Sequence, residues 1–215
     1  MTEEFTRKTQ ELMDIVGEIT NCHKCVLAHS RKQAVPGAGP ANAEIILIGE
    51  GPGFHENEQG LPFVGQAGNF LNELLETAGL KREDVYITNV VKCRPPGNRD
   101  PEVDELDACK LYLEKQITII DPLVIVTLGR FSMAQYFPNT RISQIHGKPD
   151  WRNDRFIVPM YHPAAALHQP KLRPVINQDF SRLPEMVAKA KEKKDQSRNQ
   201  ETESSTTDAT QLSLL

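Results

Sequence analysis

Short apolar runs alternate with longer amphipathic segments along this chain. The runs are rich in β-branched residues, as is typical of buried parallel strands, and the longer segments carry apolar residues at helical spacing. The expected strands lie at 45–48, 85–91, 123–128 and 156–160, and the expected helices at 3–19, 67–78, 101–116 and 130–136. This alternation predicts an α/β fold with three α/β/α layers and a four-stranded parallel central sheet.

The carboxyl ends of the expected strands carry informative residues. They are Glu50, Asn89, Gly129 and His162, each at or just after the end of a run. Ligands of parallel sheets bind at the carboxyl ends of the strands, so these residues mark a candidate site. A lone histidine is more often structural than catalytic, but His162 follows a strand and precedes Pro163 at this same edge, which favours a function.

Segment 49–68 combines glycines with titratable side chains, and we expect it to be the loop that forms this site. It reads GEGPGFHENEQGLPFVGQAG and directly follows the first strand. Its glycines allow positive φ and let backbone N–H groups approach a ligand closely. A glycine-rich turn with solvated carboxylates is the structural alternative. A phosphate-binding loop of a phosphotransferase is disfavoured, because the segment lacks the G-K-[ST] ending that holds phosphates and Mg²⁺.

Length, charge and hydropathy indicate a cytoplasmic protein with one domain. The 215 residues suit a single α/β domain with tails. A net charge of −4 argues against holding nucleic acid by bulk charge alone, although basic residues gather in the middle of the chain. No run approaches the ~18 apolar residues of a membrane span, and residues 1–16 lack the apolar core of a signal peptide. We expect a cytoplasmic monomer without membrane association.

The C-terminal part of the chain changes composition. From residue 187 onward it is dominated by polar and charged residues, so we expect a domain of residues 1–186 and a disordered tail of 187–215. The terminal QLSLL resembles the Gln-Leu-Ser/Asp-Leu-Phe pattern that binds the bacterial sliding clamp, and an incidental apolar end is the alternative. The expected clamp contacts are Gln211, Leu212, Leu214 and Leu215, the last in place of Phe.

Four cysteines form a candidate metal site. Cys22 and Cys25 make a C-x-x-C pair, whereas Cys93 and Cys109 stand singly, separated by residues 94–108. Four thiols suit tetrahedral zinc or a cubane iron–sulfur cluster, and in the cytoplasm metal binding is favoured over disulfides. Structural zinc usually uses two close pairs, so this spacing favours iron–sulfur over zinc. Four unrelated buried thiols are the remaining alternative.

Three motifs and these cysteines together resemble the family 4 uracil-DNA glycosylases, the iron–sulfur branch of that superfamily. The motifs are GEGPGFHENEQGLPFVGQAG, TNVVKCRPPGNR and YHPAAAL, and the similarity runs from about residue 22 to 180. The resemblance implies a monofunctional hydrolase that flips uracil out of DNA and cleaves its N-glycosidic bond, the first step of base excision repair. It also implies a 4Fe–4S cluster on the four cysteines. A non-catalytic uracil-DNA or polymerase-associated binding domain of the same fold is the alternative.

For the base, the resemblance implies a pocket built from Glu50, Gly51, Phe63, Asn89 and His162. Phe63 stacks on uracil, while Glu50 and Gly51 line the pocket. The Asn89 amide both donates and accepts, which matches O4 and N3–H of uracil, whereas cytosine presents the opposite order at these atoms. His162 forms a hydrogen bond near uracil O2 as the base leaves.

For the sugar and the water, the resemblance implies that Glu56 acts with Asn89 and His162 as the catalytic set. The transition state resembles an oxocarbenium ion, so a carboxylate near the sugar offsets its charge and orients or activates the water. The family usually has a further acid where Asn57 stands. Glu58 and His55 are therefore candidates to assist Glu56.

For DNA, we expect contacts from Arg94, Arg99 and Leu167. Leu167 is the candidate wedge into the stack that the flipped base leaves, as apolar side chains serve in other DNA-binding proteins. The two arginines and Lys92 are expected on a DNA-facing surface shaped by the cluster, whose role is structural. His168 stands where the family often has Arg, which predicts a weaker or pH-dependent phosphate contact.

Overall fold

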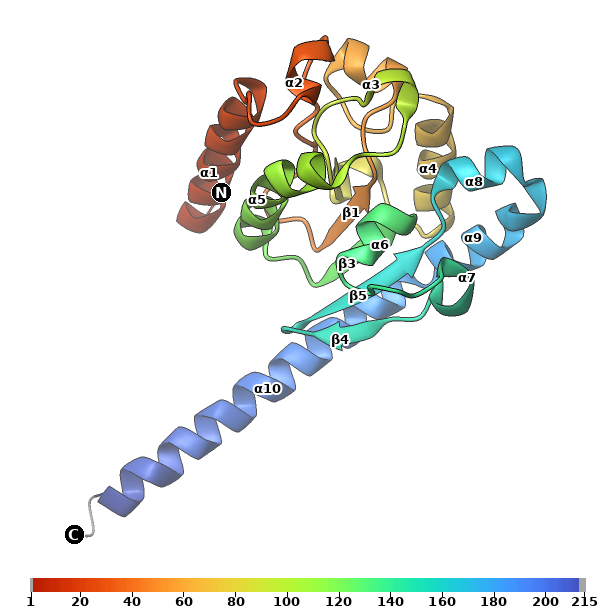
Figure 1. Cartoon of the computed structure of the whole chain (residues 1–215). Helices are drawn as coiled ribbons and strands as arrows, with labels where there is room; N and C mark the ends of the chain where they lie inside the picture. The colour runs from red at the N-terminus through yellow and green to blue at the C-terminus, as the bar shows by residue number, and fades with distance from the viewer. Residues whose placement is uncertain (1, 213–215) are drawn as a thin grey trace.

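A central β-sheet organises the molecule in the computed structural model, which describes the backbone of residues 2–212 and the side chains of 2–197. Within these residues the sheet has five strands in the order β2-β1-β3-β5-β4 (Figure 1). The neighbours β2, β1, β3 and β5 are parallel, and β4 pairs antiparallel with β5. The strands are β1 (Ile45–Gly49), β2 (Tyr86–Asn89), β3 (Val124–Leu128), β4 (Asp150–Arg152) and β5 (Arg155–Met160).

The four expected parallel strands are confirmed, but the prediction of a four-stranded sheet is wrong because β4 adds an antiparallel edge strand. β4 has only three residues, and its partly exposed sequence Asp-Trp-Arg contains no apolar run. Its turn to β5 uses Asn153 and Asp154 at φ 48° and 59°. Positive φ at both central residues is the geometry of a tight hairpin, for which Asn and Asp are suited.

Helices cover both faces of the sheet (Figure 1). On one face, Leu12 and Leu113 pack against Ile46 and Ile48. Residues of opposite parity, such as Leu47, point to the other face, where the C-terminal helices and α4 pack. The helices are α1 (Glu3–Thr20), α2 (Leu27–Ser30), α3 (Phe54–Gln59), α4 (Gln66–Thr77), α5 (Val103–Ile120), α6 (Arg130–Ala134), α7 (Ile142–Ile145), α8 (Pro163–His168), α9 (Arg173–Ser181) and α10 (Leu183–Leu212), with short 3-10 turns η1 (Arg82–Asp84), η2 (Pro96–Asn98) and η3 (Pro170–Leu172).

Segment 49–68 is not the continuous loop expected from its glycines, because α3 forms inside it. Gly53 precedes the helix, and its N–H donates to Oε2 of Glu56 at 3.1 Å. Gly60 ends the helix at φ 72°, a conformation that glycine adopts without strain. The segment therefore begins on the last residue of β1, forms two glycine-rich turns on either side of α3, and ends in the first turn of α4.

Helix α10 continues the fold past residue 186 and extends away from the sheet (Figure 1). Val187 packs against the core and Ala190 is buried, so its first turns belong to the packed structure. The helix includes most of the region predicted as a disordered tail. The division of the chain into a domain and a tail at residue 186 stays a prediction. The expected clamp contacts lie outside the described side chains, and Leu214 and Leu215 lie outside the described backbone.

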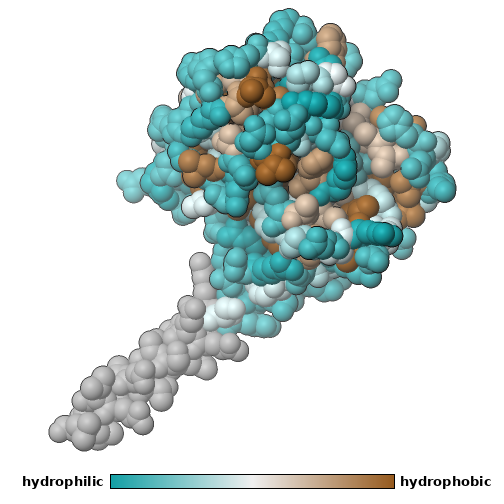
Figure 2. All heavy atoms as spheres, in the orientation of Figure 1, coloured by the Kyte–Doolittle hydropathy of each residue, from teal (hydrophilic) through white to brown (hydrophobic). Residues whose placement is uncertain are grey.

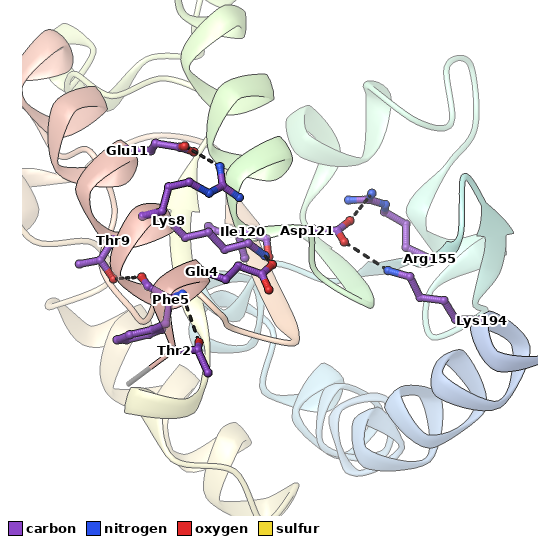
Figure 3. Close-up of polar contacts among 11 residues, drawn as sticks. Thr2, Glu4, Phe5, Lys8, Thr9, Glu11, Ile120, Asp121, Arg155 and Lys194 are labelled. Atoms are coloured by element: carbon purple, nitrogen blue, oxygen red, sulfur yellow. Dashed lines mark hydrogen bonds and ion pairs between the residues drawn. The ribbon is translucent and has the colours of Figure 1, made fainter. Parts of the chain in front are cut away.

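Polar contacts join the C-terminal end of α5 to α1, β5 and α10 (Figure 3). Asp121 accepts from Arg155 at 2.9 Å and from Lys194 of α10 at 3.2 Å. Lys8 of α1 donates to the Ile120 carbonyl at 3.4 Å. Exposed ion pairs contribute about 0–1 kcal/mol each, so the buried apolar layers supply most of the stability.

The face seen in Figure 2 is mainly hydrophilic, with apolar residues in small separate patches. Monomeric proteins commonly have such a surface. Within residues 2–212, no helix combines the length and the apolar character needed to cross a bilayer.

Candidate active site

A cavity of about 480 Å³ lies at the carboxyl ends of the parallel strands. It collects residues from three of the four expected strand ends and from segment 49–68, together with residues from the turn at 95–99 and from α8, whereas Gly129 is not part of the lining. In Figure 1, α3 and α8 lie at the end of the molecule opposite the free end of α10. Its lining includes Glu50, Gly51, Gly53, Glu56, Phe63, Asn89, Pro95, Asn98, Arg99, His162, Ala164 and His168.

Asn89 ends β2 with its side chain buried in the wall of this cavity. It is only 2 % exposed, and its Oδ1 has no hydrogen-bond partner among the described residues. A buried acceptor without a partner is rare, because desolvation costs free energy that a hydrogen bond normally offsets. An acceptor left unpaired on a residue of the cavity wall makes Asn89 a candidate for contact with a ligand.

His162 caps α8 and contributes its ring to the cavity. The Ala164 N–H donates to Nδ1 of His162 at 3.1 Å. Burial lowers the pKa of His162 to about 4, against the opposing effect of the Glu56 charge. The ring is therefore neutral near pH 7, and because Nδ1 accepts, its proton is on Nε2. The site presents a neutral imidazole donor.

Phe63 forms the wall beside this imidazole. Its ring is buried and stacks on the His162 ring, with centroids 5.5 Å apart and an interplanar angle of 27°. The Phe63 backbone has φ 51°, which is unfavourable for an aromatic residue. Gly68 permits this turn, since a Cβ at Gly68 would lie 2.0 Å from the Phe63 carbonyl oxygen. Strained backbone of this kind is concentrated at functional sites.

Glu56 links the two glycine-rich turns of segment 49–68. Its Oε1 accepts from the N–H groups of Val64 and Gly65 at 2.9 and 3.0 Å, and its Oε2 accepts from Gly53. An ionised carboxylate is a strong acceptor for backbone N–H groups. The side chain thus holds the loop in place while its carboxylate lines the cavity.

The polar residues next to Glu56 in this segment have different contacts. Asn57 is buried, and its Oδ1 accepts from the Lys32 backbone N–H at 2.9 Å. Glu58 pairs with the Lys32 ammonium at 2.5 Å. Neither residue lines the cavity, and exposed His55 lies with its ring edge-on to Phe54. The geometry therefore favours Glu56 acting without Glu58.

Glu50 provides a second carboxylate in the cavity. Burial raises the pKa of Glu50, the charge of Asp100 raises it further, and the charge of Arg130 opposes both. Arg130 also pairs with Asp100 on the surface. The group therefore becomes neutral more readily than an exposed glutamate as the pH falls.

One of the basic residues expected on a DNA-facing surface, Lys92, is not at the surface. The prediction for Lys92 is wrong, because its ammonium is buried and donates to Thr88, to the Asn89 carbonyl and to Gln116 at 2.6, 2.8 and 2.7 Å. A buried charge is tolerated only with such partners, and they come from positions that the local sequence does not connect. The composition of the segment gave no signal for this burial.

The three residues expected to contact DNA lie near the cavity but differ in their exposure and in their contacts. They are Arg94, Arg99 and Leu167. Arg99 lines it, but its guanidinium donates to both carboxylate oxygens of buried Glu105 at 2.9 and 2.6 Å. Arg94 is partly exposed beside η2. Leu167 is 41 % exposed on α8, next to His168 in the lining. Leu167 is thus the most exposed of the three expected contacts, and the Arg99 guanidinium is engaged by a carboxylate.

All four cysteines line one small cavity beneath the 92–109 segment. Within the described part of the chain, no group of three or more metal-binding side chains is close enough, as arranged, to hold an ion. Three donors already point at sulfur: Arg31 Nη1 to Cys93 at 3.0 Å, and backbone N–H groups to Cys22 and Cys109. Burial raises the pKa of Cys109 to about 11. The donor set and the surrounding N–H groups fit a cluster of thiolate ligands.

Arg31 is a residue of this region that the sequence analysis missed. Besides Cys93, its guanidinium donates to the carbonyls of Ile19, Thr20 and Cys22 at 3.5, 2.7 and 3.0 Å. It therefore fastens the end of α1 to the cysteine cavity. The only signal in the sequence is its position a few residues after the C-x-x-C pair.

Comparison with known proteins gives consistent matches. A family model described as the uracil DNA glycosylase superfamily matches residues 36–183. A type-4 uracil-DNA glycosylase of Sulfurisphaera tokodaii is 46% identical, over 82% of this chain and 84% of the relative. Relatives with the same description from Archaeoglobus fulgidus and Saccharolobus solfataricus are 46% and 47% identical. These matches cover 84% and 81% of this chain, and 95% and 85% of the relatives.

Proposed function

The chain belongs to the type-4 uracil-DNA glycosylases of the uracil-DNA glycosylase superfamily, and from this premise we propose how its cavity acts on DNA. It is a hydrolase of N-glycosyl bonds that removes uracil from DNA and so begins base excision repair. A base within a duplex is out of reach, so the nucleotide is flipped into the cavity. The observation that carries the proposal is a buried, unpartnered Asn89 Oδ1 in the same cavity as the neutral His162 ring.

Asn89 selects the base. Its Oδ1 accepts from uracil N3–H, while its Nδ2 donates to uracil O4. Cytosine has an acceptor at N3 and an amino group at C4, so it would leave both groups of the amide unpaired. Each buried unpaired polar group costs about 1–3 kcal/mol. The ring of Phe63 lines the same cavity and provides the surface on which uracil stacks.

Gly49 keeps the space that Asn89 and Phe63 require. A Cβ at this position would lie 2.3 Å from Asn89 Oδ1 and 2.8 Å from Phe63 Cζ. Gly49→Ala is therefore expected to lower kcat/KM for uracil release by about 10²-fold, since displacements near 1 Å have costs of this size. Gly17→Ala is the matched control, because its Cβ would meet no atom within 4 Å. Equal activity of the two variants in a uracil-release assay would remove Gly49 from the site.

His162 stabilises the leaving base. As the N-glycosidic bond breaks, negative charge develops on uracil and positive charge on the sugar. The Nε2–H of the neutral imidazole donates to uracil O2, and this hydrogen bond strengthens as charge develops there. Because Nδ1 is held by the Ala164 N–H, the ring is fixed before the substrate arrives.

Glu56 stabilises the cationic sugar and orients the water. Oε1 accepts two backbone N–H groups, but Oε2 accepts only that of Gly53, so Oε2 retains a lone pair for a water molecule. The carboxylate charge offsets the cationic sugar, and the oriented water adds to the anomeric carbon. The water hydroxyl ends on the sugar, and the other proton leaves through Glu56 to solvent or to the released uracil.

The test is an oligonucleotide with one uracil, incubated with the protein and then treated with alkali, which cleaves the strand at abasic sites. We expect scission only after the alkali step, together with one released uracil per abasic site by mass spectrometry. The same oligonucleotide with thymine in place of uracil is the control and should stay intact. No scission at excess protein over DNA would contradict the assignment.

The four cysteines, Cys22, Cys25, Cys93 and Cys109, hold a 4Fe–4S cluster in this proposal. Bound there, the cluster supplies a structural crosslink between the end of α1 and the 93–109 segment, and the hydrolysis requires no electron transfer. The shared cavity and the N–H groups directed at sulfur support the assignment.

Purification without oxygen should give a brown protein with about four iron and four sulfide per chain. Cys109→Ser is expected to lower the iron content and the melting temperature together, because one of the cluster ligands is lost. Elemental analysis and thermal unfolding measure the two effects. A colourless protein with one zinc per chain would contradict the cluster.

The expected partners follow from the same premise. Uracil-containing DNA is the substrate, and we propose a cytoplasmic monomer. The QLSLL end would bind a sliding clamp, which raises the local concentration of the enzyme at replicated DNA without new DNA contacts.

A further inference from the structure

An exposed aromatic ring beside the cavity has no part in the mechanism above. Phe54 is the first residue of α3 and immediately follows Gly53, which lines the cavity. Its side chain is 53 % exposed. A single exposed apolar residue needs no explanation by itself. The contacts that Phe54 makes, and its position at the edge of the cavity, are what suggest a role.

Two polar side chains hold the Phe54 ring. The guanidinium carbon of Arg94 lies 5.3 Å from the ring centroid, and the His55 ring is edge-on at 5.4 Å and 83°. Arg94 is itself fixed, because its Nε donates to Asn98 Oδ1 at 2.7 Å. Asn98 lines the cavity, as does Pro95, the neighbour of Arg94 in the chain. The Phe54–Arg94 pair therefore joins α3 to the 94–98 turn at the cavity.

We propose that the Phe54–Arg94 pair is a stacking surface for the base that neighbours the flipped uracil in the same DNA strand. This inference rests on the proposed function. When uracil leaves the stack, its neighbour loses a stacking partner, and this loss is part of the cost of flipping. Aromatic rings and arginine planes bind single-stranded bases by stacking, with little preference for sequence.

The placement of the pair relative to α8 limits which base it can meet. Helix α8 supplies Ala164 and His168 to the cavity and carries the exposed Leu167. Gly53, Pro95 and Asn98, which are close in the chain to Phe54 and Arg94, supply other parts of the lining. A strand whose uracil enters the cavity thus has one neighbour available to Leu167 and the other to Phe54. We infer that Phe54 stacks on one flanking base only.

The positive charge of Arg94 favours nucleic acid over an apolar peptide as the occupant. Its guanidinium carries a positive charge that attracts the phosphates beside the flipped nucleotide. The chain neighbours of the pair, Gly53 and Pro95, line the cavity that receives the uracil. A flanking base with its phosphate matches both the ring and the charge.

The experiment uses the full chain and single-stranded oligonucleotides with one uracil. In two further oligonucleotides, the nucleotide on the 5′ or the 3′ side of uracil is replaced by a spacer without a base. For the unmodified protein, one of the two replacements should raise KM about 5- to 150-fold, the size expected when one stacking contact is lost. The kcat for uracil release should change less than twofold.

Phe54→Ala should raise KM on the complete oligonucleotide by a similar factor and should then be insensitive to the same spacer. Phe54→Trp should restore sensitivity, because a large aromatic face is retained. Met13→Ala, which removes a side chain that is 62 % exposed on α1, is the control and should behave as the unmodified protein. Arg94→Lys keeps the charge but loses the planar group, and an intermediate KM is expected.

Two results would overturn the inference. One is an equal response of the Phe54→Ala variant and the unmodified protein to the spacer, since the flanking base would then be held elsewhere. The other is an unchanged KM in Phe54→Ala with all substrates. Thermal unfolding of each variant separates these outcomes from loss of fold. Absence of uracil release by the unmodified protein would instead contradict the proposed function and not this surface alone.

Discussion

Replacing His162 with asparagine is expected to lower kcat for uracil release by about 10²- to 10³-fold, the usual effect of removing one donor to a developing oxyanion. Asparagine is a favourable first residue before a helix, so it keeps an acceptor for the Ala164 N–H while losing the Nε2 donor. The fold should therefore survive. Single-turnover kinetics with excess enzyme measure the chemical step, and KM should change little.

The pH dependence distinguishes this role from a structural one. Burial lowers the pKa of His162 to about 4, so the ring stays neutral from pH 8 down to about pH 5. Protonation would place a hydrogen on Nδ1, where the Ala164 N–H already donates, and the fixed orientation would be lost. The part of kcat that depends on His162 should thus be flat over this range and fall only near pH 4. An inflection near 6.5 that disappears in His162→Asn would contradict a buried neutral ring.

The lowered pKa of His162 also makes the free energy of unfolding depend on pH. The unfolded chain has an ordinary histidine pKa near 6.5 and binds a proton before the folded chain does as the pH falls. His162 therefore leaves stability unaffected above pH 6.5 and lowers it progressively between 6.5 and 4, by about 1.4 kcal/mol per unit of separation. Urea unfolding at pH 7 and pH 5 should show a smaller difference for His162→Asn than for the unmodified protein.

The carboxyl ends of the parallel strands are the part of the site that could be predicted from the sequence. Glu50, Asn89 and His162 are far apart in the chain, yet they line one cavity because β1, β2 and β5 are parallel strands of one sheet. β-branched runs are a local signal, and the rule that ligands bind at strand ends needs no side-chain detail. The position of a candidate residue was therefore more predictable than its contacts.

The errors come from tertiary contacts that local composition does not encode. Lysine is normally exposed, and Lys92 is buried because its ammonium donates to the oxygens of Thr88, Asn89 and Gln116. The glycines of segment 49–68 indicate turns, while the helix between them depends on the capping carboxylate of Glu56. The motif also gave no indication that three backbone N–H groups donate to this carboxylate.

Replacing Asn89 is expected to change base selection. Asn89→Ala loses both hydrogen bonds to uracil, and at about 1–3 kcal/mol for each buried group kcat/KM should fall roughly 10²- to 10⁴-fold. Asn89→Asp has no amide donor for uracil O4, but a carboxylate oxygen can accept from the amino group of cytosine. This variant should therefore raise the ratio of cytosine to uracil release above that of Asn89→Ala, whereas DNA binding should change little.

The comparison of the two Asn89 variants separates base reading from a packing role. Both lose uracil activity if Asn89 merely fills the wall of the cavity, but only reading of the base edge makes the aspartate variant more active on cytosine. The ratio of cytosine release to uracil release is measured with oligonucleotides that carry either base opposite an abasic site. Each is incubated with the variant and then treated with alkali. An unchanged ratio in Asn89→Asp would remove Asn89 from base reading. It would also leave its unpartnered Oδ1, buried at the end of β2, without a function in this cavity.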